Sequence, residues 1–296
     1  MKPAHWICVN LTVLALLVSS SAQAQTSSHA TELLAKHAAF ESQLKARAFG
    51  EPLHLVSHEK DGRLEGEVYA ELDQPFAQVA AVLSSADSVC AMLFLHLNIR
   101  SCKVSRSDSG PQLALSVGPK QAGSTVSTYS MTYAMQADAA DTDYLGVKLS
   151  ASSGPLSTKD YVIVIEATPL DRQRTFLHFG YAYTYGSLAR MAMGIYLATA
   201  GRTKIGFTAV GTGADGQPQY VQGERGSLER NVMRNYLALK AYSGVQTGTP
   251  QAQMEARLRA WFALTERHAA QLHEMDLDQY LQEKHADLAR MGVPTQ

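Results

Sequence analysis

The sequence predicts an α+β fold in which an antiparallel sheet is covered by one long C-terminal helix. Residues 174–187, RTFLHFGYAYTYGS, alternate large rings with smaller residues, a pattern typical of a strand with one covered face. Further segments between residues 53 and 167 alternate in the same way. Residues 224–243 then carry apolar residues at helical spacing. A helix of about 17 residues is roughly 25 Å long, which is enough to cross several strands.

The composition indicates a globular chain without a nucleic-acid partner. The 296 residues carry a formal net charge of -1, and 46% of them are hydrophobic. This length suffices for one large domain or two small ones. The sequence has no run of basic residues that would follow phosphates, so we expect no binding to nucleic acid.

Residues 1–24 have the pattern of a secretory signal peptide. Lys2 supplies a positive start, residues 7–18 are almost wholly apolar, and Ala22-Gln23-Ala24 forms a cleavage signal. The apolar run is about a dozen residues, shorter than the ~20 needed to span a bilayer. We therefore predict cleavage and export to the periplasm or the exterior, the alternative being a retained membrane anchor. No later run in the sequence is long and apolar enough to span a membrane.

Two cysteines, Cys90 and Cys102, remain after the predicted cleavage, because Cys8 leaves with the signal peptide. An oxidising compartment favours a disulfide between them, and closing that loop would stabilise the fold by about 3 kcal/mol. The alternative is two buried free thiols. Two cysteines without a nearby ligand set do not make a zinc site, so no metal ligand is assigned.

The N-terminal half predicts a helix, a strand pair and two short helices. The helix falls within residues 25–50 and ends before Pro52. Strands follow at 53–57 and 63–72, and the second has an apolar face opposite a charged, solvated one. One helix is predicted to start at Pro75, and a second is predicted at 88–97.

A run of strands and a set of helices complete the chain. Strands are predicted at 112–117, 124–136, 144–151, 161–167, 174–185 and 204–211. Residues 186–201, with glycine at both ends, predict either a lid over a cavity or a fixed packing helix. Two further helices within 250–292 have thin apolar stripes, so they must dock on the sheet domain, on a partner or on each other.

This order of elements resembles the START-like superfamily, also called helix-grip or SRPBCC. Two segments carry the resemblance, GEVYAELDQPFAQVAAVL at 66–83 and GSLERNVMRNYLAL at 226–239. The resemblance implies a curved antiparallel sheet wrapped around the long helix, with an apolar cavity between them. It also implies binding of a hydrophobic small molecule such as a lipid or sterol. The predicted organisation is a signal peptide at 1–24, an N-terminal helix within 25–50, a START-like domain at 51–245 and a helical extension at 250–292.

Aromatic, methionine and amide side chains are the candidate lining of that cavity. A buried tyrosine hydroxyl needs a partner, so several inward tyrosines favour a cavity with polar contacts over a dry core. An ordinary core beneath the helix is the alternative for any one of them. The candidate ligand-binding residues are Tyr129, Met131, Tyr133, Leu149, Phe179, Tyr181, Tyr183, Met191 and Asn235.

No catalytic residue is assigned from the sequence. It has no G-x-S-x-G, no glycine-rich phosphate loop and no HExxH motif, and His96 in an apolar run is typical of a core histidine. We expect no cofactor. Two alternatives to binding remain: a cyclase- or hydrolase-type enzyme in the same cavity, and an interaction module whose C-terminal helices dock on an envelope protein. Under the binding interpretation, ligand binding survives removal of residues 250–296.

Overall fold

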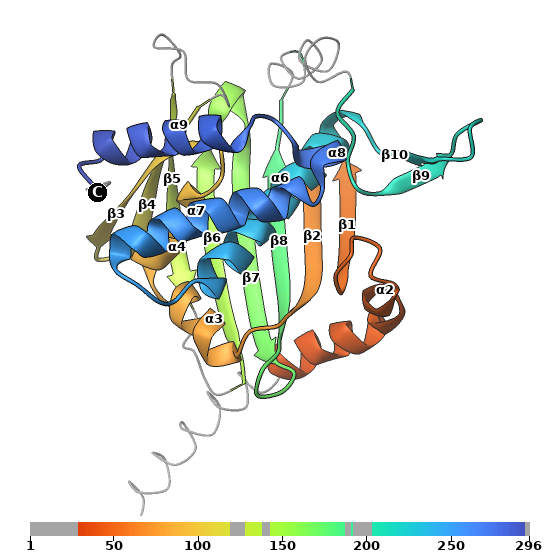
Figure 1. Ribbon diagram of the computed structural model, residues 1–296, viewed down its shortest axis with the longest axis horizontal. Helices are drawn as coiled ribbons and strands as arrows, with labels where there is room; N and C mark the ends of the chain where they lie inside the picture. The colour runs from red at the N-terminus through yellow and green to blue at the C-terminus, as the bar shows by residue number, and fades with distance from the viewer. Residues whose placement is uncertain (1–28, 119–127, 138–142, 187–190, 192–202, 294–296) are drawn as a thin grey trace, which may run out of the picture.

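An eight-stranded antiparallel sheet forms the body of the protein (Figure 1). The structure is a computed structural model and describes residues 29–118, 128–137, 143–186, 191 and 203–293. In spatial order the strands run β1, β2, β8, β7, β6, β5, β4 and β3. Their bounds are β1 Leu53–Lys60, β2 Arg63–Leu72, β3 Ile99–Ser107, β4 Gly110–Val117, β5 Tyr129–Ala137, β6 Leu145–Ser153, β7 Lys159–Pro169 and β8 Thr175–Thr184.

The long helix α6, Gly223–Gly244, crosses the inner face of this sheet. The short helices α3, Phe76–Leu83, and α4, Ala86–Phe94, pack beside it. Helix α7, Pro250–Glu266, lies on the side of α6 away from the sheet, followed by α8, Ala269–Leu272, and α9, Leu277–Arg290 (Figure 1). This is the helix-grip arrangement with additional helices at both ends, so the predicted fold class is confirmed.

Strand β2 shows why the sheet and α6 fit together. Its alternation puts Leu64, Val68 and Leu72 on the inner face, where all three are buried, as the sequence predicts. Gly66 lies between them, and a Cβ atom there would be 2.8 Å from Cγ2 of Val232 on α6. Only glycine therefore allows the helix to approach this strand so closely.

The outer face of the sheet carries a second, smaller core that the sequence pattern did not predict. Residues 29–39 and helix α2, Glu41–Ala46, supply Leu33 and Leu44, which bury Tyr69 of β2 and Phe176 of β8. The expectation of a solvated outer face is therefore wrong around these rings. The cause is that amphipathic N-terminal residues return to cover them, which strand alternation cannot show.

Prediction and structure differ, or cannot be compared, at three places in the chain. Strand β3 was not predicted, because it is an edge strand with serine, lysine and arginine along it. The predicted strand 204–211 is wrong in its extent, since β9, Ala209–Thr212, pairs only with β10, Pro218–Tyr220, in a separate hairpin. The predicted helix 186–201 lies almost entirely outside the described residues.

The described helices were also compared with the requirements of a membrane span. None of them alone is long and apolar enough to cross a bilayer. Helices α3 and α4 together reach the required length and composition, but they are bent by 92°. Their apolar side chains are buried in the main core of the protein.

Candidate functional site

A cavity of about 140 Å³ lies between α6, the sheet and the turn that follows α4. Helix α6 packs directly on β1, β2 and β8. The cavity lies beside this contact, between α6 and strands β4, β5 and β7. Among the described residues its lining is Leu93, His96, Asn98, Ile99, Leu115, Val117, Met131, Tyr133, Pro155, Tyr161, Ile163, Tyr181, Asn231 and Asn235. The site is thus an apolar space with a few polar groups at defined positions.

Three tyrosines project into this space from β5, β7 and β8. The rings of Tyr133 and Tyr181 lie 6.4 and 6.1 Å from that of Tyr161 between them. The Tyr161 hydroxyl donates to Oγ1 of Thr158 at 2.6 Å. The described part of the chain supplies no hydrogen bond to the hydroxyl of Tyr133 or Tyr181. These two hydroxyls are therefore available to a bound molecule.

Burial also fixes the protonation state of these tyrosines. It raises the pKa of Tyr181 well above its ordinary value, and it raises the pKa of Tyr133 and Tyr161 in the same direction. The phenols therefore stay protonated and can donate a hydrogen bond as well as accept one. They are not bases for a proton-abstraction step.

Helix α6 contributes two amides opposite the tyrosines. Between Leu228 and Leu239 every residue is buried except Asn231 and Asn235, and both of these line the cavity. The Asn235 amide nitrogen donates to the backbone carbonyl of Asn231 at 2.9 Å. One N–H and the amide oxygen of Asn235 remain available to a ligand, together with the Asn231 side chain.

The turn after α4 adds an imidazole and a third amide. The backbone N–H of Asn98 donates to Nδ1 of His96 at 3.1 Å, which places the ring proton on Nε2 in the neutral tautomer. The side-chain oxygen of Asn98 is buried and has no hydrogen-bond partner within the described ranges. A buried acceptor without a partner is costly, so it is a further place for a ligand donor or a water molecule.

The structure brings together four of the nine predicted ligand-binding residues. Met131, Tyr133, Tyr181 and Asn235 line the cavity. The other five lie elsewhere. Three of them, Leu149, Phe179 and Tyr183, lie in the buried core. The other two are on the surface, with Tyr129 43% exposed and Met191 60% exposed. Strand alternation predicts which side a residue faces, but it does not predict how far along the strand the cavity extends.

His96, Asn98 and Asn231 line the cavity but were absent from the predicted set. Asn231 has a usable signal, since it lies one turn before Asn235 on the same helix face. His96 and Asn98 have none, because a turn has no periodicity. No carboxylate is among the described lining residues. No group of His, Cys, Asp and Glu suited to a metal ion occurs in the described segments.

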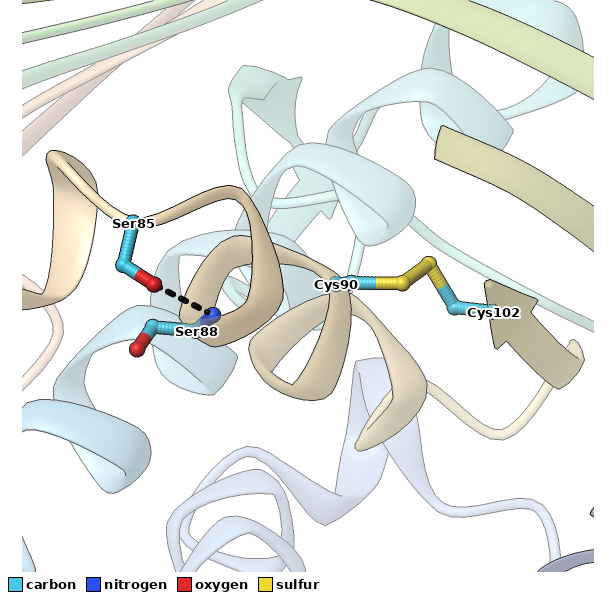
Figure 2. The surroundings of a disulfide bond; sticks show 4 residues. All are labelled: Ser85, Ser88, Cys90 and Cys102. Atoms are coloured by element: carbon cyan, nitrogen blue, oxygen red, sulfur yellow. Dashed lines mark hydrogen bonds between the residues drawn. A yellow bond between two sulfur atoms is a disulfide. The ribbon is translucent and has the colours of Figure 1, made fainter. Parts of the chain in front are cut away.

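A disulfide holds the turn that carries His96 and Asn98. Cys90 of α4 and Cys102 of β3 are joined, with their Cα atoms 5.6 Å apart, so the predicted bridge is confirmed (Figure 2). The start of α4 is capped by Ser85, whose hydroxyl accepts from the backbone N–H of Ser88 at 3.2 Å (Figure 2). The start and the middle of this short helix are thus fixed.

Comparisons with known proteins give structural likeness at low similarity. No family model and no curated protein matches the chain. A START superfamily protein from Mycobacterium smegmatis is 16% identical with a TM-score of 0.31, covering 50% of this chain and 92% of that chain. An aromatase/cyclase from a Streptomyces species is 14% identical with a TM-score of 0.29, covering 82% and 99%. A truncated norcoclaurine synthase from Thalictrum flavum is 12% identical with a TM-score of 0.30, covering 48% and 82%. The strand order and the packing of α6 on the sheet are those of an α+β helix-grip fold.

Proposed function

We propose that this protein binds a small, mostly apolar molecule with one or two hydrogen-bonding groups in the cavity under α6. The observation that carries the proposal is the pair of tyrosine hydroxyls, of Tyr133 and Tyr181, that receive no hydrogen bond from the described residues and face an apolar space. The amides of Asn231 and Asn235 lie on the opposite wall. Such convergent polar groups in an apolar cavity fix the orientation of a ligand.

The volume of the cavity sets the size of the ligand. At about 140 Å³ it is close to the 150 Å³ cavity that holds one benzene molecule, and it is below the roughly 300–1,000 Å³ of common ligand pockets. This favours a single substituted ring, such as a phenol or an aryl ketone, over the lipid or sterol that the resemblance implies. Burying about 150–250 Å² of ring surface contributes about 4–6 kcal/mol before association costs, so this burial alone gives an affinity no tighter than tens of micromolar.

Export places this binding in the cell envelope or outside the cell. The support is the signal-peptide pattern of residues 1–24, which lie outside the described residues. Mass spectrometry of the protein recovered from the periplasmic fraction tests this, with Gln25 expected as the first residue. Recovery of the intact N-terminus with membranes would support a retained anchor instead.

An interaction module on an envelope partner has less support. The C-terminal helices bury Leu258, Trp261 and Tyr280 in the same core as the sheet, so their apolar stripes are used within the chain. An acid–base enzyme has less support for the reason given above, that the described lining holds no carboxylate.

Calorimetric titration with phenols, aryl ketones, a fatty acid and a sterol tests the proposal. We expect the single-ring compounds to bind and the two larger ones to fail. Tyr181→Phe should weaken binding about three- to tenfold, the worth of one hydrogen bond. Tyr183→Phe is the matched control, because the same change two residues away is outside the lining and should leave affinity unchanged. Binding of the sterol alone, or of nothing, would contradict the proposal.

A further inference from the structure

Lysine 284 of α9 is buried beneath the end of α4. Its ammonium nitrogen donates to the backbone carbonyls of Phe94 at 2.6 Å, His96 at 2.8 Å and Ile99 at 2.7 Å. The side chain is 1% exposed, and the nitrogen lies 4.2 Å from the centre of the Phe94 ring. A lysine so completely enclosed is rare unless its charge is fully paired.

The three acceptors suit an ammonium group in number and in charge. Phe94 is the last residue of α4, and the last carbonyls of a helix lack partners within the helix and carry a partial negative charge that favours a cation. An ammonium has three N–H donors, one for each carbonyl, whereas a neutral amine has two. The hydroxyl of Tyr280, one turn before Lys284 on α9, donates to the Leu95 carbonyl at 2.7 Å. Two side chains of α9 therefore donate hydrogen bonds to four backbone carbonyls within residues 94–99.

This turn is also a wall of the cavity. His96, Asn98 and Ile99 line the space under α6, and the Cys90–Cys102 bridge closes the turn from the other side. The side chains that meet the cavity and the carbonyls that meet Lys284 belong to the same few residues. A movement of the turn away from α9 would therefore move His96 and Asn98 within the cavity.

We infer that Lys284 is a positioning residue for the ligand site: its side-chain nitrogen fixes the turn after α4 so that His96 and Asn98 form a preorganised wall. The effect on ligand affinity rests on the proposed function, whereas the effect on the turn does not. The C-terminal extension is accordingly a part of the binding site, although none of its residues is among the described lining.

Several charged groups face Lys284 and set its protonation. Glu283 and Asp287 lie on its own helix, and Arg100 comes from β3. Burial lowers the pKa of Lys284 to about 7; the charge of Asp287 opposes this and that of Arg100 adds to it. Because this pKa lies below that of a solvated lysine, an opening that solvates the amine takes up a proton, so opening of the turn should become rarer as the pH rises through about 7.

Hydrogen exchange of the segment 94–102 in the full chain tests the inference. Lys284→Met keeps an unbranched side chain but removes the donors, and we expect exchange in this segment to become about tenfold faster at pH 6. Leu281→Ala is the matched control, because it removes buried packing from the same helix, leaves Lys284 in place and does not border the space that Phe94 and Cys102 line. In this control, the increase in the exchange rate of segment 94–102 should be no larger than the increase for the amides of α9.

A ligand titration and a pH series complete the test. A phenol that binds the wild type should bind Lys284→Met about tenfold more weakly and the control almost unchanged. In the wild type, exchange of the segment, corrected for its intrinsic pH dependence, should slow between pH 6 and pH 8.5, and in Lys284→Met it should not change with pH. The wild-type series needs no variant and so decides the matter even if Lys284→Met does not fold.

The outcomes separate this inference from the proposed function. Unchanged exchange of segment 94–102 in Lys284→Met, or a flat wild-type series, would overturn the inference whether or not a ligand binds. Faster exchange with unchanged affinity would also overturn it, since Lys284 would then serve the fold alone. Absence of binding to the wild type would overturn the proposed function and remove the ligand site from the inference, while the exchange data would still decide whether Lys284 fixes the turn.

Discussion

Glu229 of α6 is a fully buried carboxylate that joins three parts of the chain. It accepts hydrogen bonds from the hydroxyl of Ser57 on β1 at 2.5 Å and from the backbone N–H of Phe207 at 2.6 Å. Thr208 donates to it twice, from its backbone at 2.9 Å and its hydroxyl at 2.7 Å. The carboxylate thus fastens residues 207–208 to the long helix, and an ionised carboxylate is the acceptor that so many donors require.

Glu229→Gln is expected to lower the free energy of unfolding by about 3 kcal/mol. The variant would place an amide NH₂ group where a carboxylate oxygen now accepts hydrogen bonds. The donors that bond to that oxygen would then be unpaired. Urea denaturation measures this change, with Glu224→Gln in the first turn of the same helix as the control. A loss of less than about 1 kcal/mol would show that water or a shifted backbone replaces the lost acceptor.

His178 lies on the outer face of β8 between two carboxylates. Its Nδ1 atom is 2.6 Å from Glu166 and its Nε2 atom is 3.4 Å from Glu67. Burial alone lowers the pKa of His178, but the Glu166 hydrogen bond and the proximity of both glutamates outweigh burial and raise it. The proximity of His178 in turn lowers the pKa of Glu67. The folded protein therefore favours the protonated imidazole.

The raised pKa of His178 predicts a stability that falls with increasing pH. The contribution is fully present below the unfolded pKa of about 6.5 and is lost as the pH rises through the raised folded value. Urea denaturation across this window should show the decline in the wild type and a flatter profile in His178→Gln. His273→Gln, at a more exposed histidine that also pairs with a glutamate, should keep the wild-type slope.

At the scale of single residues, the sequence predicts which face of the sheet a side chain lies on, but it does not predict which residues surround that side chain. Met131, Tyr133 and Tyr181 could be assigned to the inner face because strand alternation is periodic. Lys284 could not, since a lysine on a C-terminal helix has the pattern of a solvated residue. Its burial depends on the turn after α4, which is almost 190 residues away in the chain.

At the scale of elements, strand position in the sheet decides what the sequence could predict. Strands β2, β7 and β8 have neighbours on both sides and alternate clearly, and all were predicted. The edge strand β3 and the β9–β10 hairpin bury few apolar side chains, so their patterns carry little signal. The N-terminal helical residues were predicted, but the face on which they dock was not.

The disulfide gives a prediction at this scale, because it joins one helix to one strand. Its cysteines are separated by 12 residues, so replacing both by serine should lower the free energy of unfolding by about 3 kcal/mol. Chemical denaturation of the Cys90→Ser, Cys102→Ser double variant measures this. The wild type under a dithiol reductant should match the double variant. An unchanged midpoint in both would mean that Lys284 and Tyr280 alone suffice to hold the turn.

For the whole molecule, the C-terminal extension shares the core of the sheet domain. The indole N–H of Trp261 on α7 donates to the Arg234 backbone carbonyl of α6 at 3.0 Å, and Trp261 is buried. The guanidinium of Arg234 in turn donates to the Leu272 carbonyl at 3.1 Å and to Glu274 at 2.8 Å. The long helix is thus covered by the sheet on one side and by the extension on the other.

Removal of residues 250–296 is therefore expected to abolish both folding and ligand binding, the opposite of the result that the sequence led us to expect. The deletion would expose apolar residues of α6 and leave the buried guanidinium of Arg234 without Glu274 and Leu272. Circular dichroism in the near ultraviolet and dye binding to exposed apolar surface measure the loss of packing. Removal of residues 25–46 is the comparison, because that segment covers a separate, smaller core on the outer face and should leave a folded domain with a lower melting temperature. A C-terminal deletion that stays folded and binds the phenol with wild-type affinity would contradict both this prediction and the role given to Lys284.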